Sequence, residues 1–159
     1  MKNSFKSLKF IYSLARFNPE NYPKVNTIDD YYIGIDGNKI PLKILSRFNK
    51  NDKSTIIMFP GASPDAEKHP GMLFLGSIIC KLGYRVIIPR IPPLKELILN
   101  EKCFNWFAHA YEQIMLREDI IKDKVSAMAL SFGGAVLLKA SLDSRVFSNP
   151  PKSIMTFGT

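Results

Sequence analysis

One stretch of the sequence decides the fold: VSAMALSFGGAVLL, residues 125–138. Its first part, Val125–Leu130, is a short apolar run of the kind found in strands that are buried on both faces of a sheet. The run leads directly into Ser131, and residues 132–143 then have the pattern of a helix. The stretch therefore predicts a strand, a tight turn at the serine and a helix, which is one half of a βαβ unit.

The segments on both sides of this stretch alternate strands and helices in the same way. Two runs rich in β-branched and aromatic residues flank Asp36-Gly37 and predict a β-hairpin over Tyr31–Leu45. We predict three further strands, at residues 55–59, 84–88 and 153–157, and two further helices, at residues 70–82 and 105–117. Alternating strands and helices indicate the α/β class, with a mostly parallel sheet and helices on both faces.

The first 26 residues differ from the rest. Residues 1–17 carry only basic charges, and their apolar residues recur at helical spacing, so we predict a basic amphipathic helix followed by a connector over residues 18–26. Two interpretations stay open for this helix, namely docking on the domain or contact with a membrane surface. Residues 27–159 are interpreted as part of a single domain. No run approaches the roughly 18 to 20 apolar residues that a spanning helix requires.

Composition limits the classes of function. The chain has 159 residues, 46% of them hydrophobic, and a net charge of +8, values that suit one globular domain. The basic residues are scattered and follow no nucleic-acid-binding signature, so we expect no nucleic-acid partner. Cys80 and Cys103 lack the spacing of a metal or redox site, and no glycine-rich phosphate loop follows a strand, so we expect neither metal nor cofactor. A cytoplasmic location is expected, with peripheral membrane contact through residues 1–17 as an alternative. The oligomeric state stays open.

The serine at the strand-to-helix turn is the strongest candidate for chemistry. Small residues stand two positions before it (Ala129) and after it (Gly133, then Gly134), as a turn that exposes a nucleophilic side chain requires. The backbone N–H of Phe132 then lies where an oxyanion would form. The alternative for Ser131 is a structural helix cap.

A second turn supports this interpretation. The strand at residues 55–59 is followed by Pro60-Gly61-Ala62, where the N–H of Ala62 would be a second oxyanion donor. Gly61 is equally well explained as an ordinary loop glycine.

The order of these elements and the stretch Ala129-Leu130-Ser131-Phe132-Gly133 resemble the α/β-hydrolase family, over about residues 31–159. The resemblance implies that Ser131 is the nucleophile and that the N–H groups of Phe132 and Ala62 form the oxyanion hole. It implies hydrolysis of an ester, thioester or amide of a small acyl substrate through an acyl-enzyme. The alternative is a non-catalytic binding or scaffold protein with the same fold.

The family's acid and histidine should follow the nucleophile, but no histidine follows Ser131 in this sequence. His69, in the loop before Pro70, and Arg90, after the strand at residues 84–88, are candidates for a loop that faces the site. His109 is interpreted as a flank residue of its helix. We therefore expect the chain to be a truncated part of a longer hydrolase that lacks the triad acid and base, and to be inactive alone.

Overall fold

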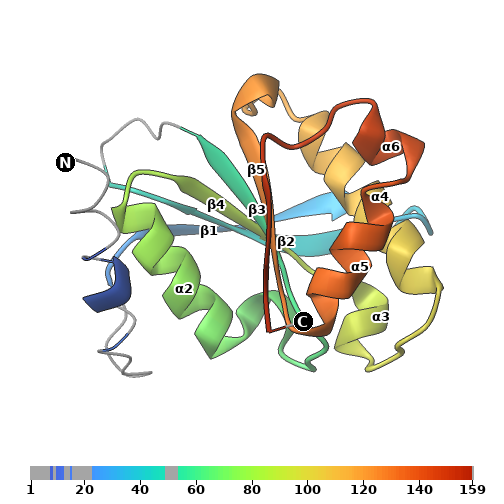
Figure 1. The fold of residues 1–159 in the computed structure, drawn as a ribbon, viewed down its shortest axis with the longest axis horizontal. Coiled ribbons are helices and arrows are strands. Elements are labelled where there is room, and N and C mark those ends of the chain that lie inside the picture. Colours follow the sequence, from blue (N-terminus) through green and yellow to red (C-terminus); the bar gives the residue numbers. More distant parts are fainter. Residues whose placement is uncertain (1–7, 9, 13–14, 16–22, 49–53, 159) are drawn as a thin grey trace.

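The structure is a computed structural model, and it describes residues 8, 10–12, 15, 23–48 and 54–158. One mixed sheet of six strands runs through it in the order β1-β2-β4-β3-β5-β6 (Figure 1). The strands are β1 (Asn26–Ile33), β2 (Lys39–Ser46), β3 (Thr55–Phe59), β4 (Arg85–Pro89), β5 (Val125–Leu130) and β6 (Ile154–Phe157). β1 and β2 form the antiparallel hairpin, β2 is antiparallel to β4, and the other pairs are parallel. The predicted α/β class is confirmed.

Helices cover both faces of the sheet. The helical elements are η1 (Ala66–Lys68), α2 (Pro70–Lys81), α3 (Pro92–Lys95), α4 (Lys102–Met115), η2 (Lys122–Lys124), α5 (Phe132–Ala140) and α6 (Ser144–Phe147). Figure 1 shows α2 on one side of the sheet and α3 to α6 on the other. The central strand β3 is buried along its whole length, as its unbroken apolar run predicts.

The sheet divides the buried apolar side chains into two clusters. The larger one lies under α4 and α5, where the rings of Phe59 and Phe107 stack with their centroids 4.5 Å apart. The smaller one lies under α2 and includes Met58, Ile79 and Met128. Neighbouring residues of β5 therefore contribute to opposite clusters, with Ala127 and Ala129 in the larger and Met128 in the smaller. This two-sided burial fixes the register of β5 and so the position of Ser131 at its end.

The predicted amphipathic helix over residues 1–17 lies mostly outside the described residues. Its described residues, 8, 10–12 and 15, are helical. Phe10 is half-buried against the cluster under α2, which agrees with docking on the domain. Within the described part of the chain, no helix has both the length and the apolar character needed to cross a membrane.

Three predicted boundaries are wrong by three residues or more. The first strand of the hairpin begins at Asn26 and not at Tyr31. The helix predicted over residues 132–143 ends at Ala140, because Asp143 caps a separate short helix, α6, by accepting a hydrogen bond from the N–H of Arg145 (3.0 Å). The helix predicted to begin at residue 105 begins at Lys102. There the side chain of Asn100 accepts a hydrogen bond from the N–H of Lys102.

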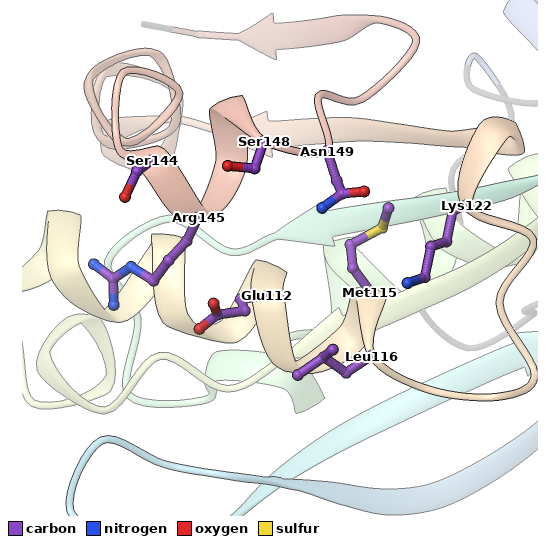
Figure 2. A pocket seen from close by; sticks show the side chains of 8 residues that line it. All are labelled: Glu112, Met115, Leu116, Lys122, Ser144, Arg145, Ser148 and Asn149. Atoms are coloured by element: carbon purple, nitrogen blue, oxygen red, sulfur yellow. The ribbon is translucent and has the colours of Figure 1, made fainter.

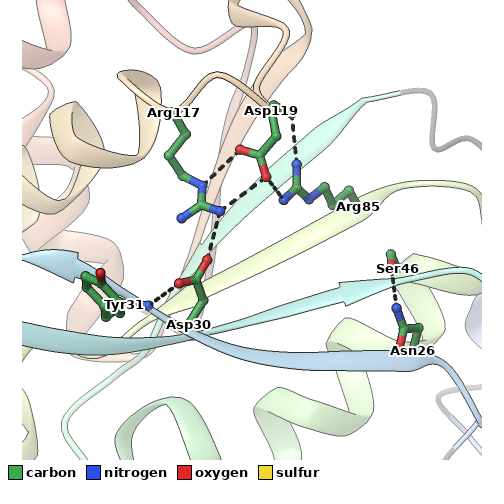
Figure 3. Close-up of polar contacts among 7 residues, drawn as sticks. All are labelled: Asn26, Asp30, Tyr31, Ser46, Arg85, Arg117 and Asp119. Atoms are coloured by element: carbon green, nitrogen blue, oxygen red, sulfur yellow. Dashed lines mark hydrogen bonds and ion pairs between the residues drawn. The ribbon is translucent and has the colours of Figure 1, made fainter.

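An ion-pair network ties the amino ends of the parallel strands to the hairpin (Figure 3). Arg117, just after α4, donates hydrogen bonds to Asp30 on β1 (2.9 Å) and to Asp119 (3.0 Å), and Arg85 at the start of β4 also donates to Asp119. Burial opposes ionisation of Asp119, but the bonds from Arg117 and Arg85 outweigh it and lower the pKa of this carboxyl to about 2. The network lies at the end of the sheet opposite Ser131.

We expect the substitution Asp119→Asn to destabilise the protein at neutral pH only. Because the pKa of the folded state, about 2, lies below the ordinary value of 3.8, the stabilisation is present above about pH 4 and is lost as the pH falls toward 2. The carboxylate is half exposed, so screening limits the effect at pH 7 to about 1 kcal/mol. Urea unfolding at pH 7 and pH 2.5 measures it. A difference between wild type and variant that is equal at both pH values would contradict the assignment.

Candidate active site

Ser131 lies at the junction of β5 and α5 in a strained backbone conformation. Its φ is 53° and its ψ is −139°, and it is one of three non-glycine residues with positive φ in the described part of the chain. Hydrogen bonds hold it on both sides: its N–H donates to the carbonyl of Phe157 (2.7 Å), and its carbonyl accepts from the N–H of Gly134 (2.8 Å). Such strain persists only where the surrounding structure imposes it, and it is concentrated at functional sites.

The side chain of Ser131 is exposed and does not cap α5. The helix-cap alternative from the sequence therefore has no support in the geometry. Ala129 is fully buried on β5, and Gly133 and Gly134 are buried in α5. The buried residues on both sides of the turn are therefore small. The hydroxyl is left facing solvent at the carboxyl end of the sheet.

The loop after β3 lies directly against this turn. A Cβ atom on Gly133 would stand 2.3 Å from the carbonyl oxygen of Pro60, and one on Gly61 would stand 3.0 Å from the Cβ of Ser131. A side chain at position 133 would therefore collide with the backbone, and one at position 61 would also stand 3.0 Å from the carbonyl oxygen of Leu130, a contact that requires a small shift. The ordinary-loop alternative for Gly61 does not account for this proximity to the serine.

Two backbone amides at this junction have no acceptor within the described residues. They are the N–H of Ala62, in the loop after β3, and the N–H of Phe132, in the first turn of α5. β3 and β5 are adjacent parallel strands, so both amides lie at the same edge of the sheet as Ser131. Unpaired N–H groups beside a hydroxyl are what stabilisation of an oxyanion requires.

A cavity of about 410 Å³ opens beside Ser131. The loop after β3, His69, α2 and the end of β5 form its walls, and its lining residues are Pro60, Gly61, Ala62, Ser63, His69, Gly71, Met72, Leu75, Leu130 and Ser131. Two apolar side chains of α2 line one wall, the buried Met72 and the half-buried Leu75. The cavity therefore combines a hydroxyl, loop amides and an apolar wall.

His69 lines this cavity, but its hydrogen bond does not suit a general base. It is the N-cap of α2, and its Nδ1 accepts a hydrogen bond from the N–H of Gly71 at 3.1 Å. In a neutral imidazole this places the proton on Nε2, which is then a donor and not an acceptor. His69 in this arrangement cannot take the proton of Ser131.

Arg90, predicted as a residue facing the site, does not line the cavity. Its guanidinium donates two hydrogen bonds to Glu67, at 2.9 and 2.7 Å, and these bonds raise the pKa of Arg90 above its ordinary value. The carbonyl of Arg90 accepts a hydrogen bond from the hydroxyl of Tyr32 at 2.7 Å. Arg90 thus supports the loop that carries Ala62 and His69, because Glu67 belongs to η1 within that loop.

The side chains of His109 and Asp143 are bonded to other parts of the chain. His109, on α4, places its Nε2 2.8 Å from the carbonyl oxygen of Ile33. Asp143 accepts hydrogen bonds from the guanidinium and from the backbone N–H of Arg145, and these bonds lower the pKa of Asp143 to about 2. Both side chains therefore serve the structure around them.

A smaller cavity of about 210 Å³ lies between α4 and α6 (Figure 2). Its Arg145 is already bonded to Asp143 and Asn105. The hydroxyls of Ser144 and Ser148 line it, but His69 and His109 do not. Among the described residues no group of three or more His, Cys, Asp or Glu side chains is placed to hold a metal ion.

Together, the strand order and the helix placement define the α/β-hydrolase fold, which solved structures share. A dienelactone hydrolase-like promiscuous phosphotriesterase from metagenomic libraries matches with a TM-score of 0.62 and 17% identity, over 84% of this chain and 59% of that one. An esterase from Pyrobaculum calidifontis matches with a TM-score of 0.59 and 14% identity, over 92% of this chain and 49% of that one. This chain therefore spans about half to three fifths of the length of these two proteins.

A much longer solved chain contains the same fold as one part of its length. Oligopeptidase B from Leishmania major matches with a TM-score of 0.58 and 13% identity, over 83% of this chain and 20% of that one. No family model matches the sequence, and no curated protein matches it. The similarity is thus one of fold.

Proposed function

We propose that this polypeptide carries the nucleophile half of a serine hydrolase that acts on carboxylic esters, thioesters or amides. The observation that carries the proposal is the strained, exposed Ser131 at the same edge of the sheet as two amides that have no acceptor among the described residues. The hydrolase folds of the similar structures support it.

The proposed reaction has two steps. Ser131 Oγ attacks the acyl carbonyl carbon, its proton passes to a general base, and the carbonyl oxygen becomes an oxyanion that accepts hydrogen bonds from the amides of Ala62 and Phe132. The C–O, C–S or C–N bond to the leaving group then breaks and leaves an acyl-enzyme. Attack of water on this ester restores the serine and releases the carboxylic acid.

We further propose that the general base is supplied by polypeptide that pairs with the outer edge of β6. The carbonyls of Ser153 and Phe157 accept hydrogen bonds from the β5 side, so the peptide groups of Ile154 and Thr156 face the other way, where no described strand pairs with them. A parallel strand added there would end at the same edge as Ser131. The loop after such a strand is a suitable place for the histidine.

A pH profile of p-nitrophenyl butyrate hydrolysis tests this proposal. Residues 1–159 alone are expected to show little turnover, with a protein-dependent rate that rises tenfold per pH unit between pH 7 and 10, since hydroxide must replace the missing base. Ser131→Ala should remove that rate, and His69→Asn should leave its pH dependence unchanged. The oxyanion hole and binding alone support an acceleration of at most about 10³-fold to 10⁴-fold over buffer.

A different pH profile would contradict the proposal that the general base comes from polypeptide beside β6. A rate that levels off above about pH 7 and is lost in His69→Asn would make His69 the base. A rate that is identical in wild type and Ser131→Ala would contradict the proposal that Ser131 is the nucleophile, and it would favour a non-catalytic protein with this fold.

A further inference from the structure

The cavity beside Ser131 has a lining without formal charge. Within the described residues, no Asp, Glu, Lys or Arg side chain lines it. Glu67, in the loop after β3, accepts two hydrogen bonds from the guanidinium of Arg90, which follows β4. A cationic ligand would find no countercharge in this cavity, so the lining disfavours cations.

The polar groups of the lining are mainly donors. The hydroxyl of Ser131 and the N–H of Ala62 have no acceptor among the described residues. His69 adds a third donor, because the bond from Gly71 N–H to Nδ1 leaves the proton on Nε2. Nε2 itself has no protein partner in the described part of the chain. These donors suit the oxygen atoms of a carboxylate or a carbonyl.

The position of His69 keeps it in this form. It stands at the N-terminus of a 12-residue helix, where a positive charge on the ring would meet the positive end of the helix dipole. A protonated ring would also lose the hydrogen bond from Gly71, because both ring nitrogens would then be donors. The bond from the N–H of Gly71 to Nδ1 therefore leaves the Nε2–H able to donate to a ligand.

The rest of the cavity suits a hydrocarbon chain. Met72 and Leu75 from α2 and Leu130 from β5 contribute apolar wall, and the volume of about 410 Å³ lies in the lower part of the range for small-molecule sites. An apolar wall opposite a group of neutral donors is complementary to a short- to medium-chain acyl group.

We propose that His69 is a positioning residue of this cavity, where it donates its Nε2–H to an oxygen atom of the bound acyl compound, and that this donor lets the cavity hold a free carboxylic acid. This inference rests on the proposed function only in that both place an acyl group beside Ser131. Binding of the free acid needs no general base. It can therefore be measured with residues 1–159 alone.

Hexanoate is the probe that tests the proposal. Long-range ¹H–¹⁵N NMR spectra of ¹⁵N-histidine-labelled protein should show His69 as the Nε2–H tautomer, and hexanoate should shift its Nε2 resonance. Calorimetric titration should give hexanoate a lower Kd than hexylammonium. His69→Asn, which keeps a side-chain acceptor for the N–H of Gly71 but removes the ring donor, should raise the hexanoate Kd about tenfold or more. The control His109→Asn, on α4 outside the cavity, should leave the Kd unchanged.

Three results would overturn the inference: an Nδ1–H tautomer for His69, equal hexanoate affinity in wild type and His69→Asn, or tighter binding of hexylammonium. Each leaves the nucleophile proposal intact, because that proposal depends on Ser131 and not on His69. Conversely, His69-dependent hexanoate binding together with a p-nitrophenyl butyrate rate that is identical in wild type and Ser131→Ala would support this inference and contradict the proposed function.

Discussion

Gly133→Ala is expected to destabilise the protein by about 3 kcal/mol and to slow any acylation of Ser131. The added Cβ would stand 2.3 Å from the carbonyl oxygen of Pro60. Because that atom belongs to the backbone, no side-chain rotation relieves the clash, and either α5 or the loop after β3 must move. A shift of Pro60 also displaces Gly61 and Ala62, so the amide that we assign to the oxyanion hole moves with it.

Thermal or urea unfolding, read together with the rate of acylation, measures both effects. Gly71→Ala is the matched control, because it adds the same methyl group to a helix but meets only the side chain of His69, at 3.2 Å and 3.3 Å. We expect that control to change the free energy of unfolding by less than about 1 kcal/mol. If Gly133→Ala were as stable as the wild type, the close approach of the two segments would be wrong.

Glu67→Gln should lower the free energy of unfolding by about 3 to 5 kcal/mol, since it leaves the guanidinium of Arg90 without its countercharge. The side chain of Glu67 is only 1% exposed, and that of Arg90 is 24% exposed, so water cannot fully replace the lost partner. Glu67 follows Ala66, whose φ is 47°, and the ion pair holds this strained turn in place. Loss of the pair is therefore expected to loosen the loop that carries Ala62 and His69.

Two comparisons isolate the buried pair. Asp29→Asn removes an ion pair whose carboxylate is 79% exposed, and it should change the free energy of unfolding by less than about 1 kcal/mol. The double variant Glu67→Leu/Arg90→Met should be less destabilised than the sum of the single variants, because it leaves no unpaired charge. Equal effects of Glu67→Gln and Asp29→Asn in urea unfolding would contradict the structural role of Glu67.

The sequence predicts the class of fold because local patterns are strong here. The apolar run of Thr55–Phe59 and the hairpin signal Asp36-Gly37 each correspond to an element of the structure. The order of the strands in the sheet is harder to predict, since buried parallel strands have similar apolar runs and only tertiary packing places β4 beside β2. Predicted helix ends were displaced where side chains such as Asp143 begin a new helix.

The candidate site was predictable in part. Ser131 and Gly133 stand out because a tight turn requires small neighbours, a constraint within a few residues of sequence. The pairing of Glu67 with Arg90 was missed, since it joins residues 23 positions apart and neither carries a local signal. Arg90 does not line the cavity beside Ser131 but is bonded to Glu67, and an arginine near a predicted site does not reveal a buried partner in the sequence. The N-cap role of His69, which decides its tautomer, also depends on three-dimensional geometry.

Mapping the residue on which a fluorophosphonate first reacts tests most directly whether Ser131 is the nucleophile. Peptide mapping by mass spectrometry should place the first adduct of residues 1–159 on Ser131, at a rate at least about 100-fold above that of any other serine, because the amides of Ala62 and Phe132 stabilise the developing charge. Ser131→Ala should remove this adduct without creating another. Labelling spread over exposed serines such as Ser144 and Ser148 at similar rates would contradict the assignment of Ser131 as the nucleophile.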